Sequence, residues 1–442
     1  MRSRVGAGSP RCTVARGDAL NERTGLAGLA VEVLSGRMTV RQSHGPTEPP
    51  RPGPGPVTPV PTPRVAPPED AEQLAGLYPV AYVGEYEKPG VWAFPQDRSR
   101  VVIGGSRGGP DEPPPDISIP ERGLSSTHCL LERRASSVRI YDMHSTNGTF
   151  VGNTRIESSW DVRIGDTFSP WPLTLFLMDS AMYEHRPMLA EILGSVRPSP
   201  DMVLTQVARH GCHVVITGAD GCGQEQLAQA IHTMSPRSAH KPIEVPIPPR
   251  DSTERNELVK RARKPKTTVF LWVPKHDKPP LDATFVGQLY DASYGVRVVA
   301  LARNEEEAER SLPKQIFWQS YRISLRPLAQ RDGEIEQLLD RMFARGDAAH
   351  LRTADLLEEN QEALRQYDWP RNLAQLKEVA EAIIALETHK GLRSASRAIG
   401  MATSTIRDRL ERPGIKLQRV GDTRNDSWSV FRPAAIRPDL TR

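Results

Sequence analysis

Residues 218–225 read Gly-Ala-Asp-Gly-Cys-Gly-Gln-Glu, and this glycine loop decides the fold of the second half of the chain. The β-branched run at 214–217 precedes it, as expected of a buried parallel strand, and residues 227–232 after it have helical spacing. In such a loop, backbone N–H groups cradle phosphates and a lysine supplies charge to the β- and γ-phosphates. Gln224 occupies the lysine position, so the sequence predicts a nucleotide-binding α/β fold without the charged part of its phosphate grip.

Further motifs extend this interpretation beyond the loop. Ala-Ile-His stands at 230–232, Ser-Pro-Arg at 235–237 and Trp-Pro-Arg-Asn-Leu at 369–373. Together with the loop, these motifs resemble the central AAA+ domain of sigma-54-dependent activators, and the resemblance covers residues 187–388. It implies an α/β AAA+ core at 187–325 and a helical lid at 326–389.

The resemblance breaks at the positions that would carry ATP hydrolysis. The apolar strand at 268–271 ends in Trp272-Val273, where the family has the Asp-Glu pair that holds magnesium and polarises water. Asn304 is the nearest match to the sensor asparagine, one residue late, and the short connection before Val269 cannot hold the loop that contacts sigma-54. The arginine fingers and the sensor arginine correspond to Pro313, Gln319 and Ala374.

These replacements remove charge from the nucleotide site. Phosphoryl transfer is catalysed largely by charge placed around the phosphates, so the sequence predicts no ATP turnover, no enzymatic activity and no cofactor. The domain is interpreted as a folded spacer or oligomerisation platform, with weak nucleotide binding as an open alternative. The vestigial loop residues are Gly218, Gly221, Gly223 and Gln224.

A second set of motifs lies at 101–178. It comprises Val-Val-Ile-Gly-Gly at 101–105, Leu-Ser-Ser-Thr-His at 124–128, His-Ser-Thr-Asn-Gly-Thr-Phe-Val at 144–151, and Gly-Asp at 165–166. This order resembles a forkhead-associated (FHA) domain, an all-β sandwich that binds phosphothreonine peptides through loops at one end. The resemblance implies an FHA domain at 76–184.

Short hydroxyl and amide side chains on turns can donate hydrogen bonds to phosphate oxygens. The resemblance assigns the phosphopeptide contacts to Ser125, Thr146 and Asn147, and gives His128 a role in bracing the loops. The family's phosphate-gripping arginine is replaced by Gly105, so Arg107, two residues on, is predicted to take its place, with Arg122 as an alternative donor. A scaffold that recognises an unphosphorylated partner is the competing interpretation.

The third motif lies near the C-terminal end. Residues 392–401 and 402–410 predict two helices joined by a glycine turn, with Thr403 or Ser404 capping the second helix. The pattern resembles the Fis-type helix-turn-helix that ends sigma-54 activators and implies a DNA-binding unit at 390–420. The residues at helical spacing that would form its small core are Ala395, Ala398, Ile399, Ile406 and Leu410.

Residues 390–419 carry eight Lys or Arg against Asp408 and Glu411, a local excess suited to phosphate backbones. A helical hairpin with an ordinary solvated basic face is the alternative. The predicted DNA-binding residues are Thr403, Ser404, Thr405, Arg407 and Asp408 for base edges, and Arg409 and Arg412, with Lys416, for phosphates.

Composition sets the remaining bounds. The 442 residues have room for two or three domains, and the net charge of +4 makes the basic character local. Four cysteines without metal-ligand spacing, and the lack of a long apolar run, predict a cytoplasmic protein without a metal or membrane partner. Residues 1–75 are predicted to be a disordered, proline-rich arm, and residues 421–442 a polar, loose tail.

The sequence therefore predicts a multidomain protein: an all-β FHA sandwich, an α/β AAA+ core with a helical lid, and a C-terminal helix-turn-helix. The predicted function is sequence-specific transcriptional regulation controlled by a threonine-phosphorylated protein, which is a Ser/Thr kinase or its substrate. Double-stranded DNA is the second predicted partner, and whether the chain forms a homo-oligomer is left open by the sequence. The alternatives are an ATP-dependent sigma-54 activator and an FHA phosphopeptide adaptor without DNA binding.

Overall fold

The computed structural model describes residues 80–106, 113–134, 137–195, 198–209, 211–264, 266–291, 293, 295–331, 333–345, 348–419 and 428–432. The predicted arm at 1–75 lies outside the described residues, as does Arg107. Among the described residues, no helix has the length and apolarity needed to cross a bilayer.

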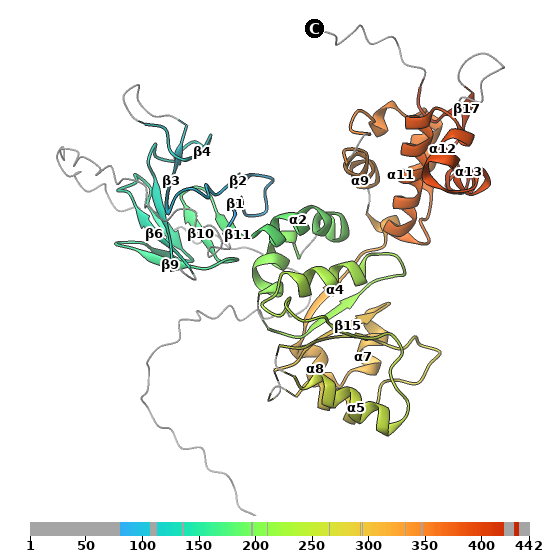
Figure 1. The fold of residues 1–442 in the computed structure, drawn as a ribbon, viewed down its shortest axis with the longest axis horizontal. Helices are drawn as coiled ribbons and strands as arrows, with labels where there is room; N and C mark the ends of the chain where they lie inside the picture. Colours follow the sequence, from blue (N-terminus) through green and yellow to red (C-terminus); the bar gives the residue numbers. More distant parts are fainter. Residues whose placement is uncertain are drawn as a thin grey trace, which may run out of the picture. The chain divides into compact units, whose positions relative to one another are not determined.

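Residues 80–178 form two β-sheets, packed as a sandwich (Figure 1). Buried side chains alternate along the strands and meet between the sheets, including Ile103, Leu131, Ile140 and Phe168. One sheet has the order β2(Val91–Ala93), β1(Tyr82–Glu85), β11(Leu175–Met178), β10(Thr167–Pro170), β7(Thr149–Val151), β8(Thr154–Arg155). The other has the order β4(Ile117–Ile119), β3(Arg100–Gly105), β5(Cys129–Arg133), β6(Val138–Asp142), β9(Trp160–Val162). The predicted β-rich domain is confirmed.

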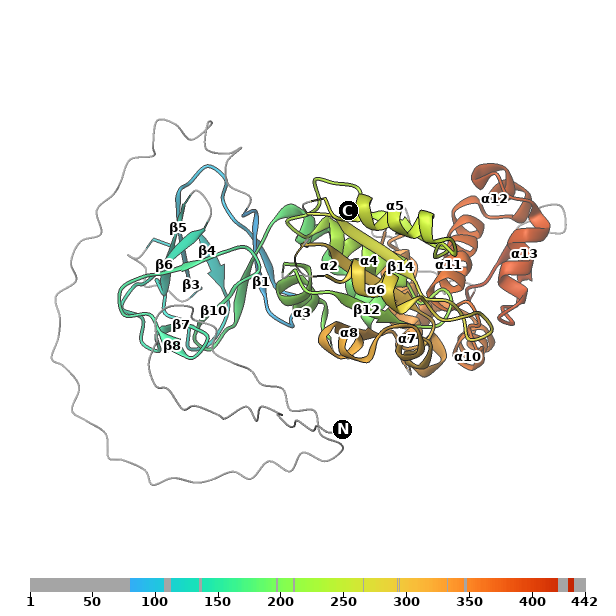
Figure 2. The ribbon, with the colours of Figure 1, turned by 90° about the horizontal axis from the view of Figure 1, so that it is seen from below.

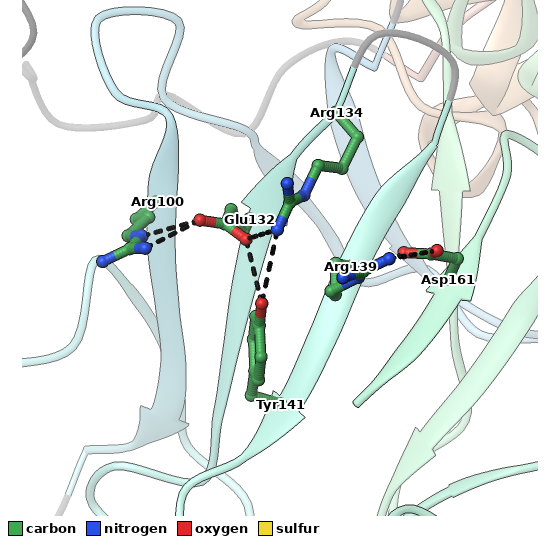
Figure 3. Close-up of polar contacts among 6 residues, drawn as sticks. All are labelled: Arg100, Glu132, Arg134, Arg139, Tyr141 and Asp161. Carbon is green, nitrogen blue, oxygen red and sulfur yellow. Dashed lines mark hydrogen bonds and ion pairs between the residues drawn. The ribbon is translucent and has the colours of Figure 1, made fainter. Parts of the chain in front are cut away.

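Charged side chains cover the outer face of the second sheet (Figure 3). Glu132 on β5 accepts hydrogen bonds from Arg100 at 2.8 and 3.0 Å and from the Tyr141 hydroxyl at 3.0 Å. Arg139 on β6 makes a bidentate ion pair with Asp161 on β9, in which Nε and Nη2 donate to the two carboxylate oxygens at 2.8 and 2.7 Å. The arginines of these cross-strand pairs are partly exposed, so the pairs support strand register more than overall stability.

The α/β region is built on a parallel sheet of order β13(Ile243–Val245), β14(Thr268–Trp272), β15(Arg297–Ala302), β12(Val214–Thr217), β16(Tyr321–Ser324). Val214 and Ile216 pack into one hydrophobic core and Val215 into another, because helices cover both faces of the sheet (Figure 2). The flanking helices are α2(Ser180–Leu193), α3(Pro200–Met202), the π-helix η1(Val203–Ala208), α4(Gln224–Thr233), α5(Ser252–Ala262), α6(Ala283–Leu289), α7(Glu305–Ser311) and α8(Lys314–Gln319).

Two helices of this region differ from the sequence prediction. Helix α5 occupies residues 252–262, within the segment before Val269 that was expected to be only a short connection. The Asp251 carboxylate caps it by accepting from the backbone N–H groups of Thr253 and Glu254. Helix α2 runs from 180 to 193, across the predicted boundary between residues 184 and 187, so that boundary falls inside a helix.

The named elements between residues 328 and 411 are all helices, and helix α11 contacts several of them. It contacts α9, α12 and α13, and buries Leu376, Val379, Ile383 and Leu386. A helix is therefore present within the predicted lid, and it also packs on α12 and α13. The elements are η3(Leu328–Gln330), α9(Ile335–Phe343), η4(Thr353–Asp355), α10(Glu358–Gln366), α11(Asn372–His389), α12(Leu392–Ile399) and α13(Thr403–Glu411).

The predicted core of the last two helices is only partly right. Ala395, Ile406 and Leu410 are buried, but Ala398 is exposed and Ile399 keeps 40% of its surface accessible. These two residues are the last two of α12, directly before the Gly400 turn. Leu392 and Ile415, which were not predicted, are buried in the same hydrophobic core as Ala395, Ile406 and Leu410.

Residues 428–432 of the predicted tail also differ from the expectation of a loose segment. Strand β18(Trp428–Ser429) pairs antiparallel with β17(Gln418–Arg419), and the Val430 and Phe431 side chains are buried. Glu387 on α11 accepts from the Ser429 hydroxyl at 2.6 Å and from the Val430 N–H at 3.0 Å. Apolar burial and a satisfied backbone thus fix this short segment onto the lid helices.

Candidate functional site

Ser125, Thr146 and Asn147 meet where two loops of the β-sandwich come together. The Ser125 hydroxyl accepts from the backbone N–H of Thr146 at 3.1 Å and lies 3.5 Å from the Thr146 hydroxyl. The Asn147 side chain donates to the carbonyl of Gly123 at 2.8 Å. Thr146 and Asn147 are exposed and Ser125 is half-buried, so their polar groups are available to a ligand. The structure thus brings these three predicted residues together.

His128 lies beneath these loops and joins them. Its ring is fully buried, with Nδ1 accepting from the Ser125 N–H at 3.2 Å and Nε2 at 3.2 Å from the Gly148 carbonyl. Both contacts are satisfied by a neutral imidazole that carries its hydrogen on Nε2. Burial lowers the pKa of His128, which favours this neutral form. The predicted bracing role agrees with this geometry.

Asp142 fixes the loop that carries Thr146 and Asn147. Its carboxylate accepts from the Ser145 hydroxyl at 2.6 Å, the Ser145 N–H at 3.1 Å and the Thr149 hydroxyl at 2.7 Å. Burial alone would raise the pKa of Asp142, but the bonds from Ser145 and Thr149 hold the pKa below its ordinary value. The loop is therefore held in place before any ligand arrives.

The position of the missing arginine has no room for a side chain. A Cβ on Gly105 would stand 2.7 Å from the Leu124 carbonyl oxygen, and one on Gly104 would stand 1.8 Å from that of Ser126. Gly105 also donates its N–H to the Ser125 carbonyl at 2.8 Å, so strand β3 runs tightly along the loop. Because of this close approach, an arginine at 105 would displace the Ser125 loop.

Arg155 on β8 was not predicted from the sequence as a site residue. The position that a Cβ on Gly148 would occupy lies 2.6 Å from Arg155 Nε and 3.1 Å from one of its terminal nitrogens. The guanidinium therefore packs against the loop of Thr146 and Asn147. To predict this contact from the sequence, the pairing of Phe150 with Arg155 between β7 and β8 would have to be known. That strand register was not predicted.

The glycine loop lies at the carboxyl end of β12, where parallel sheets bind their ligands. Gly221 and Gly223 have φ values of +81° and +101°, conformations that glycine adopts without strain. Gln224 begins helix α4, and its amide nitrogen bonds the carbonyl of Gly218 within the same loop. The side chain at the lysine position is thus turned back onto the loop's own backbone.

The lid helix is hydrogen-bonded directly to the glycine loop. The Asn372 amide donates to the Asp220 carbonyl at 2.9 Å and accepts from the Leu328 N–H at 2.7 Å. Ala374 donates its N–H to the Gly221 carbonyl at 3.2 Å. A Cβ on Gly221 would stand 2.1 Å from the Arg371 carbonyl oxygen. The loop and the start of α11 therefore pack against each other without space for another group at Gly221.

The other positions expected to act on a nucleotide carry no matching groups. Trp272 is half-buried and Val273 is buried at the end of β14, so no carboxylate is present there for magnesium. Asn304 was the candidate sensor, but its side chain caps helix α7 by accepting from the Glu307 N–H. Arg303 instead forms an ion pair with Asp220 of the loop at 3.0 Å. These residues do not fit a magnesium-bound nucleotide. No cluster of three or more metal-ligating side chains occurs in the described parts of the chain.

Helix α13 carries the predicted DNA-binding residues. It begins at Thr403 with Ala402 at the N-cap position, so neither Thr403 nor Ser404 caps it as predicted. Thr403, Ser404 and Arg407 are exposed. The others line a groove of about 240 Å³ between α13 and α11: Thr405, Asp408, Arg409 and Arg412. The predicted set is thus divided between two faces of the helix.

Ion pairs engage most of the basic side chains near this helix. Arg409 contacts Glu381 on α11 at 3.2 Å, and Arg412 contacts Asp408 at 2.8 Å. Arg407 lies 3.8 Å from Glu411, and Lys416 pairs with Glu359. Except for Arg409, which is largely buried, these pairs are exposed and worth little, so a polyanion could exchange for their carboxylates.

Two family models match parts of the chain. Residues 101–169 match the FHA domain, and residues 200–250 match the sigma-54 interaction domain. The chain is 25% identical over 262 residues to the transcriptional regulatory protein XylR of Pseudomonas putida. The aligned region covers 51% of this chain and 45% of XylR. The chain therefore spans about half the length of this curated relative.

Similar solved structures include EmbR of Mycobacterium tuberculosis in complex with a low affinity phosphopeptide. It is 22% identical, with a TM-score of 0.20, over 23% of this chain and 24% of EmbR. NtrX of Brucella abortus in complex with ADP is 16% identical, with a TM-score of 0.32, over 53% of this chain and 71% of NtrX. The FHA match at 101–169 lies within the β-sandwich, and the sigma-54 interaction domain match at 200–250 lies within the α/β region.

Proposed function

We propose that this chain is a sequence-specific DNA-binding regulator of transcription, controlled by a threonine-phosphorylated partner and working without ATP turnover. The observation that carries the proposal is the presence, on one chain, of an FHA match and a sigma-54 interaction domain match. The first supports a phosphothreonine partner, and the second supports a role in transcription. A reducing cytoplasm is the compartment that fits such a role.

Phosphothreonine recognition is supported by the loop geometry. Ser125, Thr146 and Asn147 present two hydroxyls and an amide at one end of the sandwich, on loops fixed by His128 and Asp142. Fixed hydrogen-bond donors suit a phosphate group because little order is lost when it binds. In this proposal the partner is a Ser/Thr kinase or a substrate of one.

The lack of ATP turnover is supported by the lid contacts. Gln224 supplies no charge, Trp272 and Val273 supply no carboxylate, and Asn372 and Ala374 bond the loop backbone. We propose that the degenerate AAA+ domain is a folded spacer that links the FHA domain to the C-terminal helices. The Fis-type helix-turn-helix assignment for α12 and α13 rests on their short helices, the Gly400 turn and the local basic charge.

A phosphopeptide adaptor without DNA binding is the second candidate. It is favoured by the ion pairs that occupy Arg409, Arg412 and Lys416. Salt-dependent binding to duplex DNA separates the two candidates, because only the DNA-binding regulator is expected to bind this polyanion.

The purified chain is expected to hydrolyse ATP no faster than a Gln224→Ala variant. Catalysis of phosphoryl transfer needs charge around the phosphates, and the loop region has lost it. Phosphate release is the measurement, with calorimetry for nucleotide binding. Turnover that disappears when Gly223 is changed to alanine would contradict the proposal.

Ser125→Ala and Asn147→Ala are each expected to weaken binding of a phosphothreonine peptide by about ten- to a hundredfold, the effect of losing one hydrogen bond to a charged group. The affinity for the unphosphorylated peptide should not change. Calorimetry with both peptides measures the effect, and Ser137→Ala, outside these loops, is the control. Equal wild-type affinity for the two peptides would show that the site does not recognise phosphate.

A further inference from the structure

The phosphate site proposed above has hydroxyl and amide donors but no cation among Ser125, Thr146 and Asn147. A phosphate dianion is bound most strongly by charge-assisted hydrogen bonds, and a guanidinium supplies two of them in parallel. Gly105 cannot be replaced by an arginine without moving the Ser125 loop. A cation for the phosphate would therefore have to come from a residue other than 105.

Most arginines in the described part of the sandwich are engaged elsewhere. Arg100 and Arg134 pair with Glu132, and Arg139 pairs with Asp161, on the outer face of the sheet (Figure 3). Arg98 pairs with Asp116, and Arg133 donates to the Pro95 carbonyl while stacking on Phe94. Within the described residues 80–178, the guanidinium groups without a hydrogen bond or ion pair are those of Arg122, Arg155 and Arg163.

Two of these three are poorly suited to the site. Arg163 precedes β10, whereas Trp171, whose N–H donates to the Gly148 carbonyl, follows it, so Arg163 lies at the other end of that strand. The backbone N–H of Arg122 holds the Glu121 carboxylate at 3.0 Å, which places a negative charge beside that residue. A carboxylate there opposes the binding of a second anion.

Arg155 contacts the loop itself. Its guanidinium occupies the space beside Gly148, the residue after Asn147, and the absence of a side chain at Gly148 makes that space available. The side chain is exposed at its surface and carries no bound carboxylate in the described structure. From this geometry we propose that Arg155 is the phosphate-binding guanidinium of the site, in place of the arginine missing at 105. This inference rests on the proposed phosphothreonine recognition.

The test uses the full chain and two degenerate peptide libraries, one centred on phosphothreonine and one on threonine. The measured quantity is the ratio of the two affinities. Arg155→Gln, which removes the positive charge but keeps a polar side chain, is expected to lower this ratio at least tenfold. Arg155→Lys should restore part of it, because the charge remains without the paired geometry. Arg163→Gln is the matched control and should leave the ratio unchanged.

The outcomes separate this inference from the function on which it rests. A wild-type chain without phosphate preference overturns both. A preference that is lost in Ser125→Ala but kept in Arg155→Gln overturns only the role of Arg155. A loss in Arg107→Gln with no loss in Arg155→Gln also overturns it, and assigns the role to Arg107. Equal unfolding temperatures of Arg155→Gln and the wild type ensure that a lower ratio reports binding, and Arg155→Ala provides a second variant.

Discussion

Gly221→Ala is expected to destabilise the chain by about 3 kcal/mol or more, since a strained backbone and an overpacked contact each cost about 1–3 kcal/mol. Gly221 has a φ of +81°, and a Cβ there would stand 2.1 Å from the Arg371 carbonyl oxygen. The backbone of α11 cannot yield easily, because Asn372 and Ala374 bond the same loop. The measurement is the denaturant midpoint of the full chain.

Gly287→Ala is the matched control for this prediction. Gly287 lies within helix α6, and a Cβ there would meet nothing within 4 Å. Alanine favours a helix over glycine by about 1 kcal/mol, so this variant should be slightly stabilised. A Gly221→Ala chain with the wild-type midpoint would contradict the direct packing of the lid on the glycine loop.

Arg407→Ala and Arg412→Ala are expected to weaken DNA binding in different ways. Arg407 is exposed away from the groove between α13 and α11, so its loss should relax sequence preference, with an effect of about 1–3 kcal/mol at the contacted base. Arg412 is predicted to contact a phosphate, so its loss should weaken all duplexes alike and reduce the salt slope by about one. A panel of duplexes titrated at several salt concentrations measures both effects.

Arg261→Ala, an exposed change on α5, is the control for the DNA measurements and should leave binding unchanged. If the chain is a dimer on DNA, half-sites should lie about one helical turn apart. A full chain that binds no duplex at low salt would contradict the DNA assignment and favour the phosphopeptide adaptor.

The sequence predicted the features that depend on local motifs. The hydroxyl, amide and imidazole groups of Ser125, Asn147 and His128 meet as expected, because the loops that carry them have characteristic turn residues. The strand before the glycine loop and the helix after it were also predicted. Their periodicity is a local property, and β12 and α4 have the expected places.

The features that the sequence did not predict depend on contacts between distant segments. The Arg155 contact with Gly148 requires the β7–β8 register, and the Asn372 bonds require the approach of the lid to the loop, 152 residues earlier. The exposure of Ile399 could not be deduced from helical spacing, because spacing does not show where the helix ends, and Ile399 is the last residue of α12. Likewise, Val430 and Phe431 form too short an apolar segment to predict burial on the lid.

The most direct test of the proposed function is genome-wide DNA occupancy of the chain in cells with Ser/Thr kinases active and inhibited. We expect discrete sites whose occupancy changes with kinase activity in the wild type but not in Ser125→Ala, and whose occupancy falls in Arg407→Ala. An absence of discrete sites, or the same kinase response in wild type and Ser125→Ala, would contradict the proposed function.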